Sequence, residues 1–190
     1  MIWRNIVLFF VRIFLILSPV KGYHRERIPK GACIICPNHV ALRDPFCVQL
    51  AAGSKEFFRY MAKSKYYDAP IVGPFIRSVG AFRVDPEKGY VSAIREAMRL
   101  LKKGEKVCIF PEGTRNKTGE DMEGKAGAAM IAARMNVPVV PVKIENSTKF
   151  FRIVRVTFGE PMMIEMAPRG AGNEAYHESA QRIMEAIRTL

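Results

Sequence analysis

Short apolar runs alternate with amphipathic segments along this chain, and the alternation constrains its fold more than any other feature. Residues 32–36 and 107–110 are apolar runs of the length typical of strands buried on both faces. Residues 90–103 instead repeat apolar side chains at helical spacing, and Gly104 follows as a helix-ending residue. The pattern predicts an α/β fold, a single domain with a mostly parallel or mixed central sheet flanked by helices.

The remaining segments are assigned by the same criteria. Asp44-Pro45 and Asp85-Pro86 resemble helix starts, with aspartate as the N-cap and proline in the first turn. Strands are expected at 57–62, 80–84, 137–144 and 152–158, helices at 44–52, 126–135 and 174–190, and short helical turns over 66–79. No internal repeat or second domain is evident, so residues 21–190 are expected to form one domain.

The first twenty residues differ from the rest of the chain. Residues 2–17 are almost continuously apolar, but a helix of that length reaches only about 24 Å, short of a hydrocarbon core of roughly 30 Å. Arg12 would lie near the middle of a span, and no secretory cleavage site follows. We predict that residues 1–20 form a membrane-interface helix; a helix packed on the domain's own core is the alternative.

The net charge of +12 and the sequence pI of about 9.8 indicate an anionic partner. A nucleic acid, an acidic membrane surface and a phosphorylated substrate would each satisfy that charge. The chain has no zinc-finger spacing, no aromatic RNA-recognition signature and no basic helix of the kind that reads DNA. We therefore expect no nucleic acid partner, and an anionic phospholipid membrane instead.

Four cysteines are present, and Cys33 and Cys36 form a C-x-x-C pair. Such a pair is compatible with a redox or zinc site. However, Ile34 and Ile35 lie between the two, and no second pair follows. A buried strand explains the segment more simply, and free thiols fit a reducing cytosol. No metal site is expected.

A histidine and an aspartate lie five positions apart, as His39 and Asp44. In one unbroken helix their side chains would be about 140° apart and could not pair. They can face each other if His39 lies in the loop after a strand and Asp44 opens the next helix. A carboxylate on one ring nitrogen fixes the tautomer and leaves the other nitrogen free as a base. An N-cap aspartate would already use one oxygen on the helix, and a structural role for the pair is the alternative.

Two arginines lie at strand-to-helix junctions. Arg115 ends the segment 110–115, which follows a buried strand, where α/β sheets present ligand-binding loops. Arg83 lies at a similar junction. Each guanidinium is a planar fork suited to phosphate, although each alone is an ordinary solvated charge. Together with the histidine and the aspartate, they suggest a phosphate clamp beside a base.

These segments resemble the four sequence blocks of the 1-acyl-sn-glycerol-3-phosphate acyltransferase family, within the glycerolipid acyltransferase superfamily. Three blocks match fully: N-H-x-x-x-x-D in 38–44, F-P-E-G-T-R in 110–115 and V-P-x-x-P-V in 137–142. The block G-x-x-F-x-x-R is matched loosely, because Arg83 follows Phe82 directly. Block order and intervals agree over roughly residues 30–160.

The resemblance implies roles for particular residues. His39 would be the general base and Asp44 would orient it. The acceptor's glycerol phosphate would be bound by Glu112, Gly113, Thr114 and Arg115, with Arg83 and Lys125 adding positive charge. Glu112 is expected to accept a glycerol hydroxyl or to hold an arginine, and a cap or turn role is the alternative for Thr114.

The resemblance also implies a reaction. The enzyme would transfer a fatty acyl group from acyl-CoA or acyl-carrier protein to lysophosphatidic acid, forming phosphatidic acid, without cofactor, metal or covalent acyl-enzyme. Its expected location is the cytoplasmic face of the membrane, as a peripheral or monotopic protein. Alternatives within the superfamily are enzymes that acylate glycerol 3-phosphate, another lysophospholipid or an amine. A membrane scaffold without activity is a further alternative.

Overall fold

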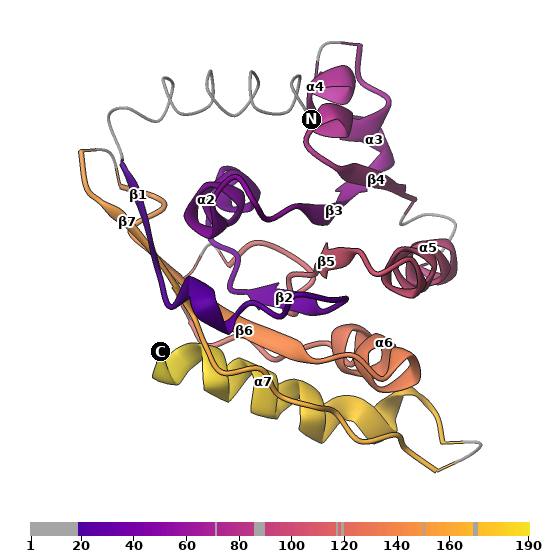
Figure 1. Cartoon of the computed structure of the whole chain (residues 1–190). Coiled ribbons are helices and arrows are strands. Elements are labelled where there is room, and N and C mark those ends of the chain that lie inside the picture. Colours follow the sequence, from indigo (N-terminus) through magenta and orange to yellow (C-terminus); the bar gives the residue numbers. More distant parts are fainter. Residues whose placement is uncertain are drawn as a thin grey trace.

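The computed structural model describes residues 19–70, 72–85, 90–116, 118, 120–149, 151–168 and 171–190. Its centre is a seven-stranded sheet in the order β1-β7-β6-β2-β5-β3-β4 (Figure 1). The strands are β1 (Val20–Tyr23), β2 (Ile34–Pro37), β3 (Phe58–Lys63), β4 (Ala81–Val84), β5 (Lys106–Cys108), β6 (Val139–Glu145) and β7 (Val154–Phe158). β2 to β6 run parallel, β7 is antiparallel to β6, and β1 is parallel to β7. The expected α/β class with a mixed sheet is confirmed.

The helices follow the strands in the expected order. They are α2 (Asp44–Ala52), α3 (Ser64–Tyr67), α4 (Val72–Ser78), α5 (Val91–Lys102), α6 (Gly127–Met135) and α7 (His177–Thr189), with the short 3-10 helices η1 (Arg25–Arg27) and η3 (Asn173–Tyr176). The short helical turns expected over 66–79 are α3 and α4. Gly104, at a φ of +81°, follows the end of α5 as expected.

Helices cover both faces of the sheet. One face packs against α5, α6 and α7, and the other packs against α2 (Figure 1). Because side chains alternate along a strand, Ile34 enters the core on the first face and Ile35 enters the core on the second. β2 is a continuous apolar run for this reason.

The first strand, β1, was not predicted from the sequence. It pairs with β7 from Val20 to Tyr23, at one edge of the sheet. Its four residues include Lys21 and Gly22, and exposed and half-buried positions alternate, so the segment resembles the basic connector to which we assigned it. Residues 1–18 of the predicted membrane-interface helix lie outside the described residues. Among the helices that the structure describes, none has the length and apolar character needed to cross a bilayer.

The C-x-x-C cysteines do not share a site. Cys33 packs in the core beside α2, whereas Cys36 packs in the core on the opposite face of the sheet. All four cysteines are free and buried. Burial raises the pKa of the Cys33 and Cys47 thiols to about 12, so both are protonated at neutral pH.

The direction of the strands positions the candidate site. The carboxyl ends of β2, β3, β4, β5 and β6 all lie at one edge of the sheet, where open α/β sheets bind ligands. β2 and β5 are direct neighbours. The segments that follow them, 38–43 and 109–116, are therefore brought side by side.

Candidate active site

His39 and Asp44 are in contact. His39 Nδ1 lies 2.9 Å from Asp44 Oδ2, and the N–H groups of Val40 and Ala41 donate to the same oxygen at 2.7 Å each. The Asp44 side chain is fully buried. Three hydrogen bonds to one oxygen fix the carboxylate, and the carboxylate fixes the plane of the imidazole.

Asp44 does not cap α2, contrary to our expectation. It is the first residue of the helix, Arg43 occupies the N-cap position, and no side chain caps the helix there. Its carboxylate points back into the turn formed by residues 39–41. Capping and histidine binding therefore do not compete for its oxygens. The second oxygen, Oδ1, is buried without a partner in the described part of the chain.

The His39 ring is held on a second side by Phe110. The two rings stack with centroids 4.0 Å apart and planes 25° apart. Because the hydrogen on Nδ1 points to Asp44, the second nitrogen, Nε2, carries the free lone pair. The side chain is 18% exposed, so a small group can reach it from solvent. The arrangement suits a general base.

The main chain of His39 is also fixed, by the segment that follows β5. Its N–H donates to Glu112 Oε1 at 3.3 Å, and its carbonyl accepts from the N–H of Asn116 at 2.7 Å. On the other side, the amide of Asn38 donates to the carbonyl of Ile144 and accepts from its N–H. Sequence reasoning gave Asn38 no role, although it belongs to the N-H-x-x-x-x-D block.

Glu112 is a buried residue, 3% exposed, whose carboxylate forms no ion pair with the residues that the structure describes. Its Oε2 also has no hydrogen-bond partner among them. Burial raises the pKa of this carboxyl, although its hydrogen bond from the His39 N–H opposes the shift. The expectation that Glu112 holds an arginine is not met among the described residues. A shifted, unpaired carboxyl beside a histidine is typical of functional sites.

The structure brings Lys125 onto Gly113. The Lys125 N–H donates to the carbonyl of Pro111 at 2.8 Å. A Cβ placed on Gly113 would lie 2.8–2.9 Å from the outer side-chain atoms of Lys125, and Gly113 has a φ of +69°. The positive φ favours glycine at this position, whereas the flexible end of the Lys125 side chain could move away from a Cβ. The neighbouring side chains of Thr114 and Arg115 are exposed and half-buried, and we find no hydrogen bond from either to the residues described.

Arg83 does not join this group. Its guanidinium is bound to Asp68 at 3.0 Å and lies 3.5 Å from Asp85. These hydrogen bonds raise the pKa of Arg83. β4 lies three strand positions from β2, about 14 Å at the usual strand spacing. Arg83 is therefore paired at the far edge of the sheet, whereas Arg115 and Lys125 lie on the segment that follows β5, the strand next to β2.

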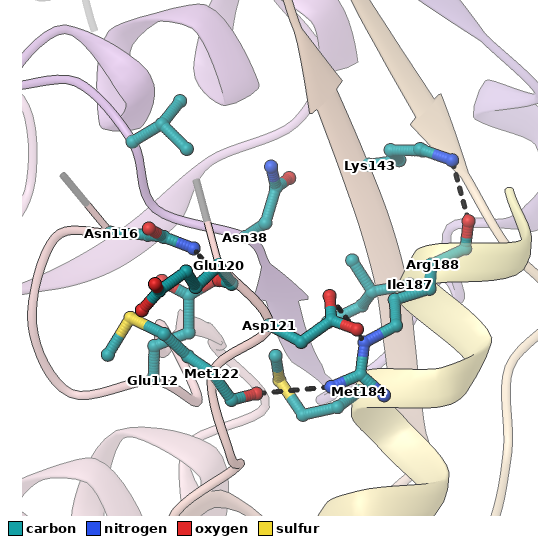
Figure 2. A pocket seen from close by; sticks show the side chains of 11 residues that line it. Asn38, Glu112, Asn116, Glu120, Asp121, Met122, Lys143, Met184, Ile187 and Arg188 are labelled. Atoms are coloured by element: carbon teal, nitrogen blue, oxygen red, sulfur yellow. Dashed lines mark hydrogen bonds and ion pairs between the residues drawn. The ribbon is translucent and has the colours of Figure 1, made fainter. Parts of the chain in front are cut away.

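A cavity of about 140 Å³ lies beside Glu112, on the α7 side of the site (Figure 2). Arg188 of α7 forms part of its wall. The guanidinium donates to the carbonyl of Met122 at 3.2 Å and lies 3.4 Å from Asp121. Lys143 donates to the carbonyl of Arg188 at 2.6 Å. Arg188 thus ties the last helix to the loop that leads into Lys125, a link that no local sequence pattern indicates.

Comparisons with known proteins identify the family of this chain. The family model described as Acyltransferase matches residues 19–145. The 1-acyl-sn-glycerol-3-phosphate acyltransferase of Bacillus subtilis is 34% identical over 75% of this chain and 73% of its own length. The enzyme of that name from Streptococcus pneumoniae is 33% identical over 94% of this chain and 70% of its own. The chain belongs to the acyltransferase family.

A solved structure of an acyltransferase also shares the fold. The 1-acyl-sn-glycerophosphate (LPA) acyltransferase PlsC from Thermotoga maritima superimposes with a TM-score of 0.70 at 28% identity, over 98% of this chain and 80% of that one. The matched family region contains every candidate site residue that we named from the sequence. α7 and its Arg188 lie beyond the region matched by the acyltransferase model.

Glu112→Gln is expected to increase the free energy of unfolding at neutral pH. The pKa of Glu112 in the folded protein is raised above 4.5. Below that pH the side chain is protonated, and its burial carries no desolvation penalty. As the pH rises through the raised pKa, the buried side chain ionises and the charge destabilises the fold. Glutamine keeps an oxygen for the His39 N–H. Urea unfolding from pH 4 to pH 8 tests this. A difference between the two proteins that does not change with pH would contradict it.

Arg188→Ala is expected to raise the acceptor KM by about five- to tenfold, equivalent to about 1 kcal/mol. We expect this increase because the substitution removes the contacts of Arg188 with Met122 and Asp121, which hold the loop before Lys125. The donor KM should change little. Arg182→Ala is the matched control, because Arg182 is exposed on the same helix. A purely structural role would lower the thermal midpoint and leave both KM values unchanged.

Proposed function

We propose that this acyltransferase moves a fatty acyl group from acyl-CoA or acyl-carrier protein to the free hydroxyl of 1-acyl-sn-glycerol 3-phosphate, forming phosphatidic acid. The observation that carries the proposal is the His39–Asp44 pair, held against the segment that contains Glu112 and Gly113. The names of the relatives in Bacillus subtilis and Streptococcus pneumoniae support the choice of acceptor.

In this mechanism His39 is the general base. Nε2 takes the proton of the acceptor hydroxyl while that oxygen attacks the thioester carbonyl. The Asp44 carboxylate, in contact with Nδ1, stabilises the imidazolium that forms. Collapse of the tetrahedral intermediate breaks the carbon–sulfur bond, and the imidazolium returns the proton to the departing thiolate. The steps balance without a metal, a cofactor or a covalent acyl-enzyme.

The acceptor phosphate is proposed to bind Arg115 and Lys125. Both follow the Glu112–Gly113 turn, and Lys125 lies over Gly113. Glu112 would accept a glycerol hydroxyl through Oε2, the oxygen that lacks a partner among the described residues. The N–H groups of Val40 and Ala41 already donate to Asp44, so the oxyanion needs other donors.

Arg115→Ala is expected to raise the acceptor KM by about ten- to a hundredfold, because a guanidinium–phosphate hydrogen bond contributes about 1.5–3 kcal/mol. The donor KM should change far less. Arg77→Ala is a suitable control, since Arg77 is exposed on α4 and bonds the carbonyl of Tyr67. Steady-state kinetics with each substrate varied in turn measures both constants. Equal effects on acceptor and donor would contradict the phosphate assignment.

The substrate class is tested with a panel of acceptors crossed with both donors. Purified enzyme with labelled acyl-CoA or acyl-carrier protein should convert lysophosphatidic acid to phosphatidic acid. Glycerol 3-phosphate, other lysophospholipids and amines form the comparison set. Faster turnover of any of these would replace lysophosphatidic acid as the acceptor. No turnover of any acceptor would leave the scaffold alternative, against which the intact His39–Asp44 contact argues.

We also propose that the protein works at the cytoplasmic face of the membrane, as a peripheral or monotopic enzyme. An acceptor with a fatty chain resides in a bilayer, and the net charge of +12 favours an anionic surface. The apolar sequence of residues 2–17 supports the same location.

A further inference from the structure

The loop between β6 and β7 presents apolar side chains to solvent. Phe151 is 78% exposed and Ile153 is 41% exposed. Phe151 also has a φ of +59°, a left-handed conformation that disfavours residues with a side chain. The loop is closed at its base, where the Asn146 amide donates to the carbonyl of Ile153. Strained backbone of this kind persists where the surroundings hold it, often at functional surfaces.

Basic side chains flank these apolar side chains. Residues 146–158 contain Lys149, Arg152 and Arg155 and no acidic side chain, and Arg155 lies 3.6 Å from Glu145, just before the loop. Lys149 and Arg152 are exposed. Exposed aromatic and aliphatic side chains between cations match the chemistry of an anionic lipid surface, with acyl chains below and phosphates above.

The loop adjoins the candidate active site. Arg43, next to Asp44 in sequence, donates through its guanidinium to the carbonyls of Ser147 and Lys149. Leu42, in the turn between His39 and Asp44, is 64% exposed. Leu42 therefore adds an exposed apolar side chain to the segment that connects His39 with Arg43 and the loop.

The start of β1 lies at the same edge of the sheet. The N–H of Val154 donates to the carbonyl of Pro19 at 2.9 Å, so the chain that follows the apolar residues 2–17 enters the fold beside this loop. Figure 1 shows the beginning of β1 next to the turn between β6 and β7. The described part of the chain thus begins beside the exposed loop.

We propose that Leu42, Lys149, Phe151, Arg152 and Ile153 form a lipid-contact surface that docks the enzyme on an anionic phospholipid bilayer. The proposal rests on the proposed function in one respect, namely that a lipid acceptor must reach His39 from the bilayer. Phe151 and Ile153 enter the interface, and the two cations bind lipid phosphates. Arg43 holds this surface to the catalytic turn, so the bound enzyme has its base turned to the lipid.

A fluorescent probe at position 151 tests the contact. Phe151→Cys in the full-length chain is labelled with an environment-sensitive fluorophore; the native thiols are buried, and burial holds their pKa far above neutral. Met163→Cys is the matched control, because Met163 is 52% exposed and follows Met162, which pairs with Val139 at the opposite end of β6. Vesicles of equal parts phosphatidylcholine and phosphatidylglycerol should shift the emission to shorter wavelength only for position 151.

Two results would overturn the proposal. One is a probe at position 151 that stays in water while sedimentation shows the protein bound to the vesicles. The other is a shift that depends on protein concentration without vesicles, which would assign the surface to a second copy of the chain. Arg152→Glu should also weaken vesicle binding by at least about fivefold, the effect of one cation near an anionic surface.

Activity separates this proposal from the proposed function. Phe151→Glu should lower turnover of long-chain lysophosphatidic acid presented in vesicles and leave turnover of a short-chain, monodisperse acceptor unchanged. Equal loss with both acceptors would contradict a lipid-contact role. An enzyme that acylates neither acceptor would refute the proposed function, and the fluorescence result would still decide the lipid contact.

Discussion

His39→Ala is expected to lower kcat by roughly 10²- to 10⁴-fold, the usual contribution of a positioned general base. The substitution removes Nε2, the nitrogen that the contact between Nδ1 and Asp44 leaves available. Substrate binding should be nearly unchanged, because the proposed phosphate ligands are on the segment after β5. Formation of labelled phosphatidic acid under saturating substrate measures the effect.

The control for this prediction is His177→Ala, since His177 is exposed at the start of α7. The stack of His39 on Phe110 is also lost in His39→Ala, so the fold must be checked by thermal unfolding. His39→Gln serves as a second variant, because its amide can still donate to Asp44 but cannot act as a base. Wild-type turnover in either folded variant would refute the base assignment.

Asp44→Asn is expected to lower kcat by about 10²- to 10⁴-fold with little change in either KM, by analogy with loss of the carboxylate in catalytic triads. The asparagine oxygen can replace Oδ2 and accept from Val40 and Ala41, so the turn can keep its shape. The negative charge that stabilises the imidazolium is lost. A buried amide N–H₂ would also take the position of Oδ1, which has no partner among the described residues.

Asp68→Asn is the matched control for Asp44→Asn, because Asp68 is an exposed carboxylate that pairs with Arg83. Thermal unfolding of Asp44→Asn separates loss of chemistry from loss of the fold. A folded Asp44→Asn protein with normal kcat would show that the carboxylate is structural. A rise in acceptor KM at constant kcat would instead place Asp44 in substrate binding.

The parts of the fold predicted from sequence are those specified by local patterns. The apolar run 32–36 and the Asp44-Pro45 pair correctly placed β2 and the start of α2. β1 was missed because it is a short edge strand, and an edge strand buries too little to produce an apolar run. The contact between His39 and Asp44 was predicted correctly, but the expected N-cap role of Asp44 was wrong, because Arg43 takes the N-cap position.

Long-range contacts account for what the sequence could not predict at the site. The chain positions alone suggested that Arg83 joins Arg115, but Asp68 binds Arg83 at the far edge of the sheet. The contact of Glu112 with the His39 N–H, and that of Arg188 with the loop before Lys125, join segments many residues apart. Such pairs follow from strand order, which a single sequence does not specify.

The hydrogen bonds of the His39 peptide have a consequence for catalysis. Neighbouring segments hold both its N–H and its carbonyl, and Asn38 extends the ladder between β2 and β6 by bonding Ile144. The base is consequently ordered when the sheet forms, before any substrate arrives. Preorganisation of this kind removes a rearrangement from the barrier of each turnover, because the entropy of positioning the imidazole is lost once, during folding.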